Sequence, residues 1–147
     1  MPDIDSLAFF DALATAMNAD PQAYEVLGDV DLDLAIEMRR PGTASFRVLV
    51  VFRGIVCTQI MEIGADEAAA ADCVLVGAVE SWDAMFADVR AHGHATGRQT
   101  INSLTLLGDR ITVTGDDPVG VDKFFRFNQT VQAFLDGAAR VATAAVG

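Results

Sequence analysis

The chain has 147 residues, which is enough for one domain with a sizeable core, and its 52% hydrophobic and 21% charged residues exclude a disordered chain. The net charge of -11 excludes nucleic acid and anionic membrane surfaces as expected partners, because phosphate binding depends on Lys and Arg. No apolar run approaches the roughly 20 residues of a membrane span, and no signal segment opens the chain, so we expect a cytoplasmic protein without stable membrane insertion.

The first third of the chain predicts a helix and then a strand. Residues 6–18 carry apolar side chains at helical spacing, and Asp5 precedes them as a candidate cap. From Asp31 the apolar period changes to two, which indicates a strand with one face in water. A turn at Pro41-Gly42 ends this strand.

Two further strands are predicted, joined at Arg53-Gly54. Residues 46–53 are apolar on both sides in their middle, which is typical of a central strand with something covering each face. Residues 55–61 alternate less cleanly. Residues 64–72 form a small acidic connection with room for a helical turn.

The second half predicts a strand at 72–79 and a helix capped by Ser81, with Trp82, Met85, Phe86 and Val89 on one face. Residues 91–99 are predicted to be a loop, 101–107 a short helical or irregular piece, and 109–115 a strand. The clearest helical stripe of the chain runs over 119–141 and consists of Phe124, Phe127, Val131, Phe134, Ala138 and Val141.

This order of elements predicts the fold class. Runs of strands combined with helices, without strict alternation, indicate an α+β protein. We expect a mainly antiparallel sheet with helices packed on one face, and a single domain over residues 1–147.

Few residues offer catalytic or metal chemistry. His92 and His94 are the two histidines, and a polar loop explains them better than a metal site completed by Asp88 or Asp109. Asp116 and Asp117 precede Pro118, which predicts a helix cap more readily than an acid-base pair. Cys57 and Cys73 are expected to be free buried thiols. We therefore expect no enzymatic activity, no cofactor and no metal.

The remaining candidates for a functional site are large apolar side chains. Large side chains on one strand and on several helices exceed what one covered sheet face needs, and ligand sites are concave and mostly apolar. The residues predicted to line such a site are Phe46, Val48, Val50, Trp82, Met85, Phe86, Phe124, Phe127 and Val131. For each of them taken singly, an ordinary core position remains the simpler interpretation.

Two motifs resemble the sterol carrier protein 2-like family. The stretch "ADCVLVGAVESWDAMFADV" matches that family's strand and capped helix through Ala71, Asp72, Val74, Val76, Trp82 and Phe86. The stretch "LLGDRITVTGDD" matches its Gly-x-(apolar)-x-(apolar)-x-Gly-Asp signature through Gly108, Ile111, Val113, Gly115 and Asp116. An amphipathic helix follows, and an opening helix and first strand precede in the same order, so the resemblance spans residues 5–140.

The resemblance implies a five-stranded sheet with helices over one face and a hydrophobic tunnel for fatty acyl, sterol or similar lipids, bound without catalysis. The segment 93–107 departs from the family because it lacks the usual Pro, which leaves its conformation open. The C-terminus lacks a peroxisomal signal, so that family location is not carried over.

Three functions are compatible with the sequence. The leading one is a lipid-binding and lipid-transport protein that shields an apolar or isoprenoid-type ligand between sheet and helices. The second is an isomerase-like enzyme with a hydrophobic pocket and one acid. The third is an accessory subunit with a filled core, for which a homodimer through the 124–141 stripe is left open.

Overall fold

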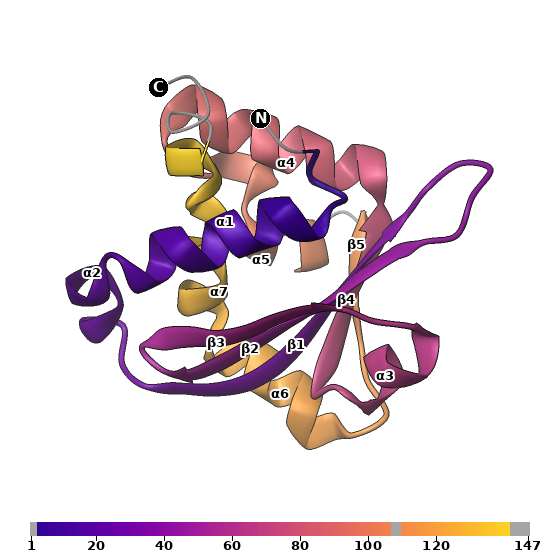
Figure 1. Ribbon diagram of the computed structural model, residues 1–147, viewed down its shortest axis with the longest axis horizontal. Coiled ribbons are helices and arrows are strands. Elements are labelled where there is room, and N and C mark those ends of the chain that lie inside the picture. Colours follow the sequence, from indigo (N-terminus) through magenta and orange to yellow (C-terminus); the bar gives the residue numbers. More distant parts are fainter. Residues whose placement is uncertain (1–2, 107–109, 142–147) are drawn as a thin grey trace.

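The computed structural model describes residues 3–106 and 110–141, and its centre is a five-stranded sheet (Figure 1). The strands are β1 (Val30–Arg39), β2 (Phe46–Gly54), β3 (Val56–Glu62), β4 (Cys73–Ala78) and β5 (Ile111–Thr114), in the order β3-β2-β1-β4-β5. Three neighbouring pairs are antiparallel, whereas β1 and β4 run parallel. The α+β class with a mostly antiparallel sheet is thus confirmed.

The alternation of apolar residues places one face of β1 in the main core. Leu32, Leu34, Ile36 and Met38 are fully buried, while Asp31 on the other face is exposed. Strand β2 lies beside β1 and buries Val48, Val50 and Phe52 on the same side. Both strands occupy central positions, as the two-sided apolar pattern of residues 46–53 predicts.

The main helices cover this apolar face. They are α1 (Leu7–Asn18), α2 (Pro21–Glu25), α4 (Val79–His92), the short 3-10 helix η1 (Gly97–Gln99), α5 (Ile101–Leu106), α6 (Pro118–Arg126) and α7 (Asn128–Asp136). Figure 1 shows α1, α4, α5 and α7 on the same side of the sheet. The buried side chains between the sheet and these helices form one connected set, called here the apolar interior.

The opposite face of the sheet is covered only in part. Helix α3 (Ala65–Ala70) packs there through Ala68, which joins Ala35, Ile63 and Val74 in a second, small core. This helix forms within the acidic connection that precedes β4.

Two predicted helix caps are wrong. Helix α1 is capped by Ser6, whose Oγ accepts from Phe9 N at 3.3 Å, while Asp5 pairs with Arg40 at 3.5 Å. Helix α4 begins at Val79 directly after β4, so Ser81 lies inside its first turn. For α1 the neighbouring cap-type residue takes the position, whereas α4 begins without a side-chain cap because it follows β4 directly.

The long helix predicted over 119–141 is wrong as one continuous element. Phe127 leaves the helical backbone (φ -103°, ψ 18°), and the chain divides there into α6 and α7. Its amide donates to Lys123 O and closes α6, whereas its carbonyl accepts from Thr130 and Val131 and opens α7. The apolar stripe continues across the break because both helices turn the same side toward the apolar interior.

Some sequence predictions fall on residues outside the described ranges. These are Leu107, Gly108 and Asp109 at the start of the second motif, and the C-terminal residues 142–147. Within the described ranges, no helix is both long enough and apolar enough to cross a membrane.

Candidate functional site

The structure brings the nine residues predicted to line a ligand site to one side of the sheet. Eight of them are at most 2% exposed and belong to the apolar interior: Phe46, Val48, Val50, Trp82, Met85, Phe86, Phe124 and Val131. Phe127 is partly buried and packs against this set. The residues come from β2, α4, α6 and α7, so four distant parts of the chain converge. That they line a ligand stays a prediction.

Aromatic rings that the prediction did not include join these elements. Phe9 of α1 meets Phe86 of α4 edge-on, with ring centroids 4.9 Å apart. Phe52 of β2 meets Phe134 of α7 in the same way at 5.3 Å. Phe10 lies 6.1 Å from Phe46. Helical spacing marks Phe10 and Phe134 as apolar positions, but only the packing of α1 and α7 against the sheet shows which rings they meet.

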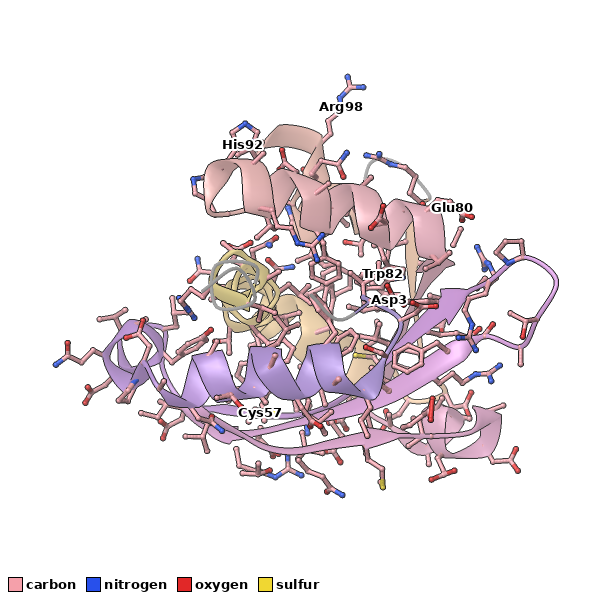
Figure 2. All side chains as sticks on the ribbon, turned by 45° about the horizontal axis from the view of Figure 1, so that its top comes forward. Asp3, Cys57, Glu80, Trp82, His92 and Arg98 are labelled. Atoms are coloured by element: carbon pink, nitrogen blue, oxygen red, sulfur yellow. The ribbon has the colours of Figure 1, made fainter. Side chains whose placement is uncertain are left out.

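The apolar interior and its margin contain polar atoms without partners. Within the part of the chain that the structure describes, Trp82 Nε1, Arg90 Nε and Nη2, Gln99 Oε1 and Asn128 Nδ2 are buried and make no hydrogen bond. Buried polar groups in proteins are nearly always paired, so each of these atoms calls for an explanation. Figure 2 shows Trp82 pointing from α4 into the molecule.

A groove of about 560 Å³ lies along α7. We call it the α7 groove; its lining residues are Leu27, Thr100, Asn102, Asn128, Gln129, Gln132, Ala133 and Asp136. Most of these side chains are polar and uncharged. The lining also includes the Asp136 carboxylate and the apolar side chains of Leu27 and Ala133.

Hydrogen bonds tie the α7 groove to the neighbouring segments. Asp136 Oδ1 accepts from Ala95 N at 3.0 Å and from Gln132 Nε2 at 2.8 Å. Gln132 Oε1 in turn accepts from Ile101 N at 2.7 Å. Burial raises the pKa of the Asp136 carboxyl, and the two donors oppose this shift. Asp136 thus holds the loop before η1 against α7.

A second groove, of about 310 Å³, lies on the opposite face of the sheet between α3 and β5. Val74 and Val76 form its apolar floor, and Glu37 and Asp116 stand at its margin. Glu37 accepts a 2.7 Å hydrogen bond from Arg47. This outer groove is separate from the nine predicted residues.

The histidines take part in surface contacts. His92 Nδ1 lies 3.0 Å from Asp88 Oδ1, and Figure 2 shows His92 on the far side of α4 from the sheet. Asp88 itself accepts from Thr96 N and Thr96 Oγ1, which lowers the pKa of its carboxyl. Across residues 3–106 and 110–141, no group of three or more His, Cys, Asp or Glu is placed to hold a metal ion.

The predicted cap of α6 is confirmed: Asp117 Oδ1 accepts from Val119 N at 2.9 Å, and Pro118 opens the helix. The cysteines are free and buried, as predicted. Burial raises the pKa of Cys57 to about 11 and that of Cys73 to about 12, so neither thiol is a nucleophile near neutral pH.

The two motifs that carry the family resemblance touch each other. Asp72, before β4, accepts from Asp33 N at 2.8 Å and lies 3.6 Å from Lys123 Nζ of α6. A Cβ on Gly120 would overlap the backbone of Asp72, and one on Gly115 would approach Asp72 O to 3.1 Å. The motifs therefore form a structural joint between β1, β4 and α6.

These observations define an α+β protein in which helices enclose an apolar interior on one face of a mixed sheet. No family model matches the chain, and no curated protein sequence matches it. Among solved structures, it is similar to the crystal structure of sterol carrier protein 2, with a TM-score of 0.69 and 16% identity over 92% of this chain and 97% of the other.

A second similar structure is the solution structure of a Thermus thermophilus protein that is described as possibly a sterol carrier protein. The TM-score is 0.71 at 15% identity, over 94% of this chain and 89% of the other. The chain therefore has a sterol carrier protein 2-like fold. The family resemblance is confirmed at the level of the fold.

Proposed function

We propose that the protein binds and presents a hydrophobic ligand, such as a fatty acyl, sterol or isoprenoid-type lipid, in the cytoplasm and without catalysis. The observation that carries this proposal is the concentration of aromatic residues. Seven of the nine phenylalanines are buried in the apolar interior: Phe9, Phe10, Phe46, Phe52, Phe86, Phe124 and Phe134. The fold likeness to sterol carrier protein 2 supports the same function.

The driving force for binding is the removal of ligand surface from water, about 25 cal/mol per Å² of apolar area, reduced by the cost of ordering the ligand and the protein. Three buried methionines give the apolar interior a means of adjusting its shape. Met17, Met38 and Met85 come from α1, β1 and α4. Unbranched thioether side chains repack at low cost.

The test is ligand binding by protein from which lipid has been removed. A fluorescent fatty acid is bound first, and fatty acids, a sterol and an isoprenoid alcohol are then added as competitors. We expect displacement by at least one of these classes. If no probe binds above background, the proposal fails, and a large apolar contact between copies in solution then favours the accessory-subunit alternative.

A matched pair of variants connects binding to the apolar interior. Val131→Phe enlarges a fully buried side chain among the predicted lining residues, whereas Val76→Phe makes the same change in the outer groove. We expect Val131→Phe to weaken probe binding roughly tenfold, because added volume competes with the ligand or strains the packing. Val76→Phe is expected to leave binding unchanged, with both variants checked for folding by circular dichroism.

One observation favours the enzymatic alternative. Asp136 is a partly buried carboxylate in the α7 groove, its pKa is raised by burial, and Gln132 lies beside it. Such a group suits proton transfer. In an isomerase Asp136→Asn abolishes turnover, whereas in a lipid carrier it leaves binding of an apolar probe intact.

A further inference from the structure

Arg90 lies near the end of α4 and presents an unpaired edge of its side chain to the inside of the protein. Its Nε and Nη2 atoms are both buried and make no hydrogen bond to any residue that the structure describes. These two nitrogens stand on the same edge of the planar guanidinium group. Their N–H bonds point in parallel, which is the arrangement that grips the two oxygens of a carboxylate.

This arginine differs from five of the ten Lys and Arg residues of the chain, which are paired with acids. Arg40 pairs with Asp5, Arg47 with Glu37, Arg53 with Asp33, Arg126 with Asp122 and Lys123 with Asp72, at N–O distances of 2.7 to 3.6 Å. The sequence contains 21 acidic residues against 10 Lys and Arg, so acids are abundant. Within the described residues Arg90 has no acid within ion-pair distance, although two of its donors are buried and unpaired.

The electrostatic environment of Arg90 agrees with this geometry. Desolvation lowers the pKa of its guanidinium, and the attraction of Asp83 opposes that shift only in part. Burying N–H groups of a cation without hydrogen-bond partners is costly, and that cost is relieved when an anion accepts from them.

Arg90 lies at the border of the apolar interior. It follows Phe86 by four residues and therefore lies one helical turn further along the same flank of α4. Phe86 is fully buried and contacts Phe9 of α1. A hydrocarbon chain packed among these rings would bring a terminal carboxylate near Arg90.

We propose that Arg90 recognises the carboxylate of an acidic lipid, with the ligand oxygens accepting hydrogen bonds from Nε and Nη2. This inference rests on the proposed function and narrows its ligand to a fatty acid. One guanidinium edge and one positive charge match a singly charged carboxylate. A phosphate monoester would bury a second negative charge without a partner.

Trp82 Nε1, the other unpaired donor of α4, belongs to a different position. It precedes Arg90 by eight residues, which corresponds to roughly 12 Å along the helix axis. A single carboxylate cannot bridge the two donors. Selection of the headgroup therefore depends on Arg90, and Trp82 is too far along the helix to take part in it.

The experiment compares ligands that share a chain and differ in the headgroup. Delipidated wild-type protein is titrated with hexadecanoic acid, its methyl ester and hexadecan-1-ol, and the same titrations are made with Arg90→Met and Arg90→Lys. The matched control is Arg98→Met, because Arg98 is exposed and points away from the molecule (Figure 2). Sodium acetate is included to detect binding of an anion without a chain.

We expect wild-type protein to bind the acid roughly 10- to 100-fold more tightly than the alcohol, as a hydrogen-bonded charge pair requires. Arg90→Met should remove this preference and leave binding of the alcohol unchanged. Arg90→Lys should retain part of it, because the charge remains and the parallel donors are lost. Arg98→Met should behave like the wild type, and acetate alone should compete weakly.

Three kinds of result overturn the inference, and they can be told apart. If acid, ester and alcohol bind equally well, or if Arg90→Met keeps the preference for the acid, Arg90 does not select the ligand while the proposed function stands. If none of the three ligands binds, the proposed function itself fails, and the inference with it. Strong competition by acetate would show an anion site that needs no lipid chain, which also overturns the inference.

Discussion

At Gly120, helix α6 approaches the chain before β4 so closely that only a residue without a side chain fits. A Cβ at this position would overlap the backbone of Asp72, which cannot move freely because its amide and carboxylate are both bonded to Asp33. The packing of α6 against the segment before β4 therefore requires a glycine at position 120.

Gly120→Ala is expected to lower the free energy of unfolding by roughly 2 to 3 kcal/mol, as over-packing of a rigid contact does. Urea unfolding followed by circular dichroism measures the change. Gly64→Ala is the control, because its Cβ would meet Glu67 Oε1 at an ordinary 3.5 Å. If both variants lose the same small amount, about 1 kcal/mol or less, the contact between α6 and Asp72 has room for a methyl group.

Residue-level predictions succeeded where local chemistry decides the outcome. The cap at Asp117 follows from a carboxylate placed before Pro118, and the free thiols follow from their apolar surroundings. Arg90 was not among the predicted site residues, because a sequence does not show which residues lie at the border of the interior. It also does not show which acids lie within reach of a given arginine. The signal was an arginine one turn after the buried Phe86.

At the scale of elements, the start of α6 depends on one side chain. Asp117 accepts from Val119 N, whereas its neighbour Asp116 is exposed and makes no hydrogen bond within residues 3–106 and 110–141. The two aspartates thus differ in role although they carry the same charge and stand side by side.

Asp117→Ala is expected to destabilise the protein by about 1 kcal/mol through the loss of the cap. Asp116→Ala should change the stability by less than about 0.5 kcal/mol, because it removes a surface charge alone. Chemical denaturation of both variants measures the difference. Equal losses would mean that charge near the helix start, and not the cap bond, stabilises α6.

The strands were predictable because a period of two is visible in residues such as Leu32, Leu34 and Ile36. The break at Phe127 was not, because spacings of three and four continue across it. A stripe reports which side faces the core, and two helices that share a core can carry one stripe. The predicted caps of α1 and α4 were displaced by one and by three residues. Ser6, next to Asp5, caps α1 through its hydroxyl, and α4 follows β4 directly with Ala78 at the cap position.

At the scale of the whole molecule, the parallel pairing of β1 with β4 joins the first three strands and the last two into one sheet. Leu34 pairs with Cys73 across this junction, which sets a strand from the middle of the chain beside the first one. Alternation shows that a segment is a strand, but not which strand is its neighbour. Likewise, the apolar spacing within each element predicts that the nine residues lie on the buried side. The room left between the sheet and the helices depends on how every ring packs, and spacing does not show it.

The stability of the whole molecule should fall at alkaline pH because of its buried acids. Burial raises the pKa of Cys57 from 9.0 to about 11 and that of Cys73 from 9.0 to about 12, and burial also raises the pKa of Tyr24. In the unfolded chain these groups lose their protons at lower pH than in the folded protein. The stability they contribute is complete below about pH 9 and is lost as the pH rises toward the folded pKa values.

We expect the free energy of unfolding to be roughly 3 kcal/mol lower at about pH 10 than at about pH 8, since each of the two thiols contributes about 1.4 kcal/mol per pH unit above about pH 9. Urea titrations across this interval measure the slope. The Cys57→Ala, Cys73→Ala double variant is less stable at every pH because it removes core volume, but its slope should be shallower, with the remainder due to Tyr24. Equal slopes in both proteins would show that the thiols do not titrate differently in the folded and unfolded states, and that the apolar interior admits water as far as Cys73.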